Sequence, residues 1–175
     1  MGRIKMNIFI LSLFPKTCAR WHIDVHVRKM IIEYAQLLST AHRYLDTDIL
    51  SADMDLVLYR RTHTNHPCAK WVRESSMNYS FLYELFVALC DEYTYRFGKV
   101  HLTDRKLRTV LRHLPQNIQD GQFTTFAQAM PDRYKTESVC EAYIGFYRGS
   151  KRLNKAGKPM DRWTRRDIPE FMFSV

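Results

Sequence analysis

Residues 26–40, HVRKMIIEYAQLLST, decide the fold because they carry two overlapping patterns of helical spacing. Apolar side chains recur every three or four residues and form one face that can be buried. That face consists of Met30, Tyr34, Leu37, Leu38 and, just beyond the stretch, Ala41. The pattern predicts a helix from about Asp24, a residue type that favours the N-cap, to about Leu45.

Polar side chains recur at the same spacing and define a second face of the predicted helix. They are His26, Lys29, Glu33, Gln36 and Thr40. An acid, an imidazole that titrates near neutral pH and a cation are the groups that a catalytic groove needs. A solvated face with one ion pair between Lys29 and Glu33 explains the same pattern, so the spacing alone leaves both interpretations open.

The rest of the chain supplies further helix signals and one extended segment. Residues 6–14 are apolar and end at Pro15, which favours a short strand or extended segment beside the core. Further helices are predicted to begin at Pro67, at Ser75 or Ser76, at Thr103 and at Thr136, and to end near Arg73, Phe97, Leu114 and Arg148. The fold class is therefore expected to be mainly α, a single-domain helical bundle of about five helices with a short extended N-terminal segment.

Composition limits the protein to a basic, globular class. The chain has 175 residues, 46% of them hydrophobic, and a formal net charge of +9. This charge points to a polyanionic partner, most simply nucleic acid, although an anionic membrane surface would attract it too. No apolar run approaches the roughly 18 residues that cross a bilayer, and no signal-peptide pattern is present. We therefore expect a cytoplasmic protein without a membrane partner.

The residue types that bind metals do not form a recognised site. Four cysteines lie far apart, without a Cys-x-x-Cys pair, which favours reduced thiols. The histidines and cysteines in residues 18–26 and 63–68 lack the spacing of a zinc site. We expect them to pack and form hydrogen bonds, and we expect Trp21 and Trp71 to lie in the core.

The segment 148–166 concentrates the positive charge of the chain. Its eight lysine and arginine residues are opposed only by Asp161. Cations follow phosphates, and Trp163 among them is a residue type that can stack on bases. A solvated basic tail that binds nothing specific is the alternative.

Several segments together share the pattern of one known family. They are the opening MGRI at residues 1–4, a helix with His26 followed seven residues later by Glu33, and the aromatic stretch YSFLYELF at residues 79–86. The late stretch YIGFYRGSK at residues 143–151 corresponds to a tail rich in tyrosine and lysine. This pattern resembles the phage-type pyrimidine-dimer DNA glycosylases, known as endonuclease V. Residues 65–71 and 89–92 are similar to phage and bacterial relatives grouped with that superfamily, which indicates a divergent branch.

The resemblance implies a DNA glycosylase and AP lyase that acts on damaged or modified pyrimidines in double-stranded DNA. In such an enzyme the N-terminal α-amine attacks C1′ of the nucleotide, the base leaves, a Schiff base forms and β-elimination cuts the strand. The amine would belong to Gly2 after removal of Met1, Glu33 would be the carboxylate near C1′, and His26 would be its polar neighbour. An α-amine suits this role because its ordinary pKa, about 7.7–8.0, leaves a useful neutral fraction at cellular pH.

The same resemblance implies a set of DNA contacts and a division of the chain. The residues expected to contact DNA are Lys29, His66, Arg73, Arg148, Lys151, Arg152, Arg162 and Arg165. Residues 1–147 would be a helical catalytic domain, and residues 148–175 a basic C-terminal extension packed on or near the DNA-binding face. The resemblance implies no cofactor and no metal, and a monomer working on DNA in a bacterial or phage-infected cell.

Some residues depart from the family pattern and keep other functions open. The family has a nucleophilic threonine where Gly2 stands, and two arginines that flank its glutamate fall on Ile32 and Gln36 here. A start at Met6 would move the free amine to that residue. The alternatives are a DNA-base-modifying transferase that acts on a flipped pyrimidine and a non-catalytic, basic DNA-binding accessory protein.

Overall fold

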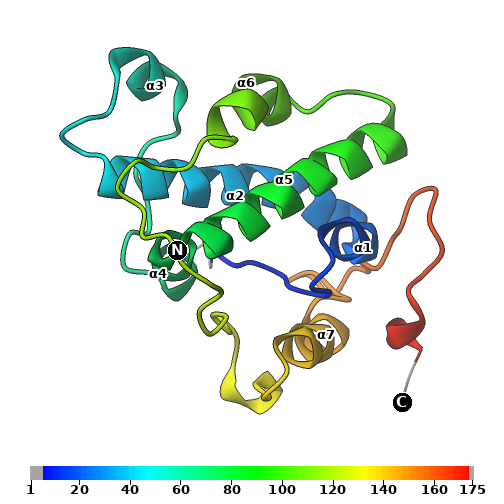
Figure 1. The fold of residues 1–175 in the computed structure, drawn as a ribbon. Coiled ribbons are helices and arrows are strands. Elements are labelled where there is room, and N and C mark those ends of the chain that lie inside the picture. Colours follow the sequence, from blue (N-terminus) through cyan, green and yellow to red (C-terminus); the bar gives the residue numbers. More distant parts are fainter. Residues whose placement is uncertain (1–5, 174–175) are drawn as a thin grey trace.

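Two long helices, α2 (Asp24–Leu45) and α5 (Ser76–Phe97), pack against each other through the centre of the protein (Figure 1). The structure is a computed structural model and describes residues 6–173. The apolar face predicted for α2 is fully buried, as are the side chains of Leu82, Leu85 and Phe86 that face it from α5. These two helices therefore carry most of the core, and the helix predicted from about Asp24 to about Leu45 is confirmed.

The ends of the long helices follow ordinary capping chemistry with one exception. The Ser75 hydroxyl accepts a hydrogen bond from the Asn78 amide at the start of α5, and Gly98, at φ 68°, ends it. Asp24 is not the N-cap of α2, because that position is held by Ile23. The Asp24 carboxylate instead accepts hydrogen bonds from Thr164 and from the buried Arg96.

Five shorter helices surround this central pair in the described part of the chain. They are α1 (Pro15–Trp21), α3 (Ala52–Val57), α4 (Pro67–Glu74), α6 (Leu102–Leu111) and α7 (Val139–Ser150), with short 3₁₀ turns at η1 (Asp132–Tyr134) and η2 (Glu170–Met172). Helices α4, α6 and α7 correspond to predicted helices, although His101 and Ser138 provide the caps of α6 and α7 that we expected from Thr103 and Thr136.

Helices α1 and α3 were not expected, and each has a local cause. Pro15 occupies the first turn of α1, where its missing N–H costs nothing, so it begins a helix rather than only ending the extended segment. The Ser51 hydroxyl accepts from the Met54 amide at the start of α3. Asp53 and Asp55 lie in the first turn of α3, where they favour the helix dipole.

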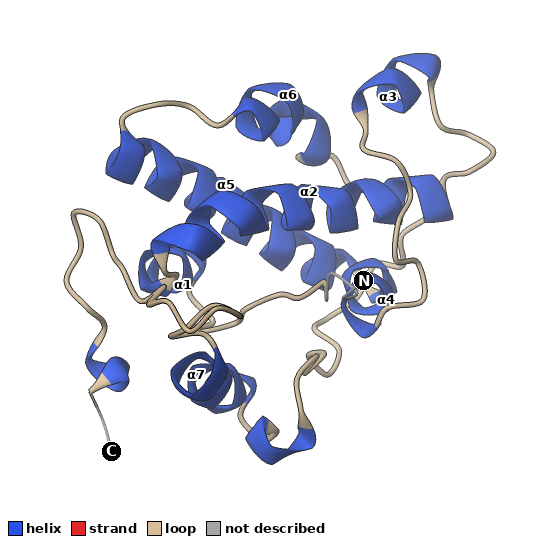
Figure 2. Ribbon diagram, turned by 180° about the vertical axis from the view of Figure 1, so that it is seen from behind, coloured by secondary structure: helices blue, strands red, loops and turns tan. Residues whose placement is uncertain are grey.

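The N-terminal segment of the described chain is extended and buried, as the sequence indicates. Residues 6–11 run below α5 between α4 and α1, with α7 on their other side (Figures 1 and 2). They form no strand. The Phe9 amide donates to the Tyr34 hydroxyl over 3.1 Å, and the Cys18 thiol donates to the Phe9 carbonyl over 3.2 Å. These contacts fix the segment against α1 and α2.

The basic segment, residues 148–166, packs against the helices, and we call it the strap. The indole of Trp163 is 6% exposed and donates to the Trp21 carbonyl over 3.0 Å. Arg166 donates from two nitrogens to the two carboxylate oxygens of Glu92, each over 2.9 Å. Trp163 is therefore part of the core, where it cannot stack on a base.

The fold class is mainly α, in a single helical domain. Helix α7 continues to Ser150, so the boundary expected after residue 147 falls inside a helix. Between residues 6 and 173, none of the helices combines the length and the apolar character that a membrane crossing requires.

A buried histidine makes the folded protein sensitive to acid. The Nδ1 of His22 donates to the Cys18 carbonyl over 2.7 Å, so its Nε2 accepts from the Tyr34 hydroxyl. Burial lowers the pKa of His22 to about 4. The unfolded chain, with an ordinary histidine pKa near 6.5, therefore binds more protons as the pH falls through this window. We expect the free energy of unfolding to fall by about 2 kcal/mol between pH 7 and pH 5, from this group alone.

Urea unfolding at the two pH values measures this loss. A His22→Asn variant keeps an amide donor for the Cys18 carbonyl but cannot titrate, so its stability is expected to change less with pH. His113→Asn, at an exposed histidine, is the control and should keep the pH dependence of the wild type. Equal stability of the wild type at both pH values would contradict a neutral, buried His22.

Candidate functional site

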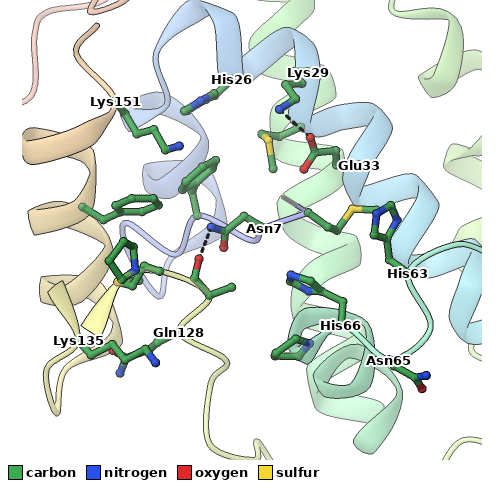
Figure 3. Close-up of a pocket in the computed structure, with 18 of the residues that line it drawn as sticks. Asn7, His26, Lys29, Glu33, His63, Asn65, His66, Gln128, Lys135 and Lys151 are labelled. Atoms are coloured by element: carbon green, nitrogen blue, oxygen red, sulfur yellow. Dashed lines mark hydrogen bonds and ion pairs between the residues drawn. The ribbon is translucent and has the colours of Figure 1, made fainter. Parts of the chain in front are cut away.

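A pocket of about 1240 Å³ opens between the N-terminal segment, α2 and α7 (Figure 3). The loop before α4 and residues 128–131 complete its walls. Its polar side chains are Asn7, His26, Lys29, Glu33, His63, Thr64, Asn65, His66, Gln128, Lys135 and Lys151. The polar face predicted on α2 thus contributes His26, Lys29 and Glu33 to one pocket, which favours the groove over a solvated face.

Glu33 is a buried carboxylate without a hydrogen-bond partner. It is 4% exposed, and neither of its oxygens accepts a hydrogen bond from any described residue. Lys29 Nζ lies 3.0 Å from Oε1, one helical turn away, but without hydrogen-bonding geometry. Buried carboxylates are normally paired and hydrogen-bonded, because removal from water costs several kcal/mol. The pocket therefore offers a carboxylate that is ion-paired with Lys29 and can still accept a hydrogen bond from an N–H donor of a ligand.

His26 is a neutral, fixed imidazole. Its ring stacks on Phe9 at a centroid distance of 4.5 Å, and its Nδ1 lies 2.5 Å from the Tyr147 hydroxyl. Burial lowers the pKa of His26 well below its usual value, and the charges of His22, Lys151 and Lys29 lower it further. His26 can therefore exchange hydrogen bonds with a ligand, but it cannot carry a positive charge near neutral pH.

Three lysines bring positive charge to the walls of the pocket. Lys29 comes from α2, Lys135 from the turn after η1 and Lys151 from the end of α7. The ammonium of Lys151 lies 4.6 Å from the centre of the Phe146 ring and 5.6 Å from that of Phe9. Lys135 was not predicted from the sequence, because it lies in a loop whose position depends on the packing of α7.

The loop before α4 contributes two histidines. His66 is the N-cap of α4, where its Nδ1 accepts from the Cys68 amide over 3.2 Å, so its Nε2 carries the proton. Arg73, predicted to bind phosphate, donates to the Thr64 carbonyl over 2.7 Å and stacks on Tyr44 at 4.0 Å. It supports this loop and is not among the lining residues.

The cations of the C-terminal segment that were predicted to contact DNA do not all reach the pocket. Arg152 pairs with Asp161 at 3.1 Å, and Arg165 donates to the Tyr95 carbonyl over 3.0 Å. Arg162 lies 3.8 Å from the Asp24 carboxylate. These three arginines and Arg148 do not line the pocket, whereas Lys151 does.

The predicted nucleophile, Gly2, lies outside the described residues. Met6, the first described residue, lines the pocket and is 1% exposed. The chain thus enters the described structure at the wall of the pocket, four residues after Gly2. Residues 6–173 contain no group of three or more histidine, cysteine, aspartate or glutamate side chains placed to hold a metal ion.

The pocket brings together groups that bind anions and transfer protons. It combines a buried carboxylate that accepts no hydrogen bond from a described residue, a neutral imidazole held by a tyrosine, and three lysines in one cavity. In the comparisons with known proteins, the chain matches no family model, no curated protein and no solved structure.

Proposed function

We propose that this protein is a DNA glycosylase and AP lyase that acts on damaged or modified pyrimidines through its N-terminal amine. The buried carboxylate of Glu33, which pairs with Lys29 but accepts no hydrogen bond from a described residue, carries this proposal. A protonated amine that enters the pocket would pair with that carboxylate. The same amine, once it has lost its proton, would be the nucleophile. Met6 supports the proposal, because this residue, four positions after Gly2 in the sequence, lines the same pocket.

The chemistry assigns Glu33 a proton-transfer role. The amine of Gly2 attacks C1′ of a flipped nucleotide, and the base leaves with the electron pair of the glycosidic bond. Glu33 takes a proton from the attacking amine and returns it to the ring oxygen O4′ as the sugar opens to the Schiff base. β-Elimination then cuts the strand. The carboxylate also stabilises the positive charge that develops at C1′.

DNA fits the charge of the chain and of the pocket walls. The net charge of +9 favours a polyanion, and Lys29, Lys135 and Lys151 border the space that a flipped nucleotide would occupy. In the family that the sequence resembles, two arginines flank the glutamate, and their positions here are Ile32 and Gln36. The three lysines would supply the positive charge instead. His66 can donate from Nε2 to a phosphate or to a pyrimidine carbonyl oxygen.

The size of the pocket supports a second candidate, a DNA-base-modifying transferase. Pockets for small molecules enclose roughly 300–1,000 Å³, and this one encloses about 1240 Å³. That space accepts a flipped pyrimidine together with a small donor molecule. Such an enzyme would need the donor and would leave the strand intact.

Incubation of the purified protein with a panel of labelled duplexes tests the proposal. The panel contains a cyclobutane pyrimidine dimer, 5-hydroxymethyluracil and an abasic site, each against an undamaged control duplex. We expect release of a damaged or modified base and strand cleavage, both abolished when the N-terminus is blocked by reductive methylation under conditions that spare lysines. Salt-sensitive binding without base release or cleavage would contradict the proposal and favour an accessory protein. A donor-dependent mass increase of the DNA would favour the transferase.

A further inference from the structure

The backbone of His63 is held in an unusual conformation at the mouth of the pocket. Its φ of 48° lies in the left-handed region, where residues other than glycine are uncommon. Several hydrogen bonds impose this conformation. The His66 amide donates to the His63 carbonyl over 2.8 Å, and Arg73 holds the next carbonyl, that of Thr64. A strained residue fixed by its surroundings at a pocket is a candidate for function.

The side chain of His63 is oriented by its neighbour. Its Nδ1 lies 2.7 Å from the Thr62 hydroxyl, which leaves Nε2 for a ligand. Thr62 is itself bound through its amide and carbonyl to the hydroxyl of Thr40 on α2. Figure 3 shows His63 on the opposite side of the pocket from Lys151. The loop therefore presents an exposed imidazole to the pocket that Glu33 also lines.

The other two histidines of the pocket are unsuited to donate a proton to a leaving group. Burial lowers the pKa of His26 well below its usual value, so it stays neutral. Burial also lowers the pKa of His66, and its Nδ1 is occupied by the cap of α4. His63 is the exposed one of the three, so its imidazole can meet a ligand directly. The charged groups around it are Lys29 and Glu33 on α2 and, across the pocket, Lys135 and Lys151.

We propose that His63 is a catalytic residue that protonates the pyrimidine as it leaves. The bond between C1′ and the base nitrogen breaks, and its electron pair stays with the base. The imidazolium of His63 gives its Nε2 proton to the base, which departs neutral, and the imidazole is left neutral. Glu33 takes the proton of the attacking amine, so the two groups move protons in opposite directions during the same displacement. This role rests on the proposed glycosylase activity of the pocket.

Chemical rescue of a His63→Gly variant tests the proposal. Glycine adopts the positive φ without strain, so the variant is expected to fold and to leave a space that free imidazole can fill. We expect base release from the damaged duplex to slow at least about 100-fold, and imidazole in the buffer to restore at least about tenfold. Cleavage of the abasic duplex should match that of the wild type, because no base has to be protonated. His63→Asn, which also tolerates a positive φ, should lose base release without rescue.

Two comparisons separate failure of this role from failure of the proposed function. A Glu33→Gln variant should lose both base release and abasic cleavage, and a wild type inactive on the whole panel would contradict the proposed function itself. If Glu33→Gln is inactive while His63→Gly releases base at the wild-type rate, or is slow but not rescued by imidazole, the role of His63 is wrong. His113→Gly, at an exposed histidine that does not line the pocket, is the control and should behave as the wild type.

Discussion

Glu33→Gln is expected to lower the rate of base release and of abasic strand cleavage by about 1000-fold. Glutamine keeps the shape of the side chain but can neither take the proton of the attacking amine nor balance the charge at C1′. The folded protein should be as stable as the wild type or more stable, because the buried charge that is removed accepts no hydrogen bond from a described residue, and its ion-pair partner Lys29 is half exposed. Single-turnover kinetics and thermal unfolding of the same samples measure the two effects.

This pairing of lost activity with kept stability distinguishes a reactive carboxylate from a structural one. A structural Glu33 would lower the melting temperature when neutralised. Glu84→Gln, at an exposed position in the middle of α5, is the control and should change neither property. Wild-type rates in Glu33→Gln would show that the carboxylate has no part in the reaction.

Arg96→Met is expected to lower the free energy of unfolding by about 3–5 kcal/mol. The guanidinium is buried on α5, where it pairs with Glu92 at 2.7 Å and with Asp24 at 3.0 Å. It also donates to the carbonyls of His22 and Arg20, each over 2.8 Å. Methionine fills a similar volume but leaves buried carboxylate and carbonyl oxygens without this donor.

Urea unfolding measures the effect of Arg96→Met at a pH where both carboxylates are ionised. Arg105→Met, at an exposed position of α6, should stay within about 0.5 kcal/mol of the wild type. The strap should loosen in Arg96→Met as well, because Asp24 also binds Thr164 and Glu92 also binds Arg166. A loss below about 1 kcal/mol would show that the network contributes little to folding.

The long helices could be predicted because their patterns are local. The apolar spacing along α2, the serine before α5 and the glycine after it specify their own segments without reference to the rest of the chain. The short helices α1 and α3 are different, because six or seven residues contain too few apolar repeats to show a helical period. Their signals were the proline and the capping serine alone.

The candidate site was predicted in part for the same reason. His26, Lys29 and Glu33 share one helix face, so local spacing brings them together. Phe9, Lys135 and Phe146 join them only because the N-terminal segment and the turn after η1 pack against α7, which no local pattern records. For the cations of the C-terminal segment, the local sequence pattern does not indicate which of them line the pocket. Charge alone could not tell that Arg166 pairs with the buried Glu92, while Lys151 lines the pocket.

Borohydride trapping followed by peptide mapping tests the role of the N-terminal amine most directly. The protein is incubated with an abasic duplex and reduced with borohydride, and the covalent adduct is digested and located by mass spectrometry. We expect one adduct, on the α-amine of the N-terminal peptide, and the same spectrum identifies which residue carries that amine. An adduct on Lys29 or Lys151, or no adduct while the strand is still cut, would contradict a Schiff base formed by the N-terminus.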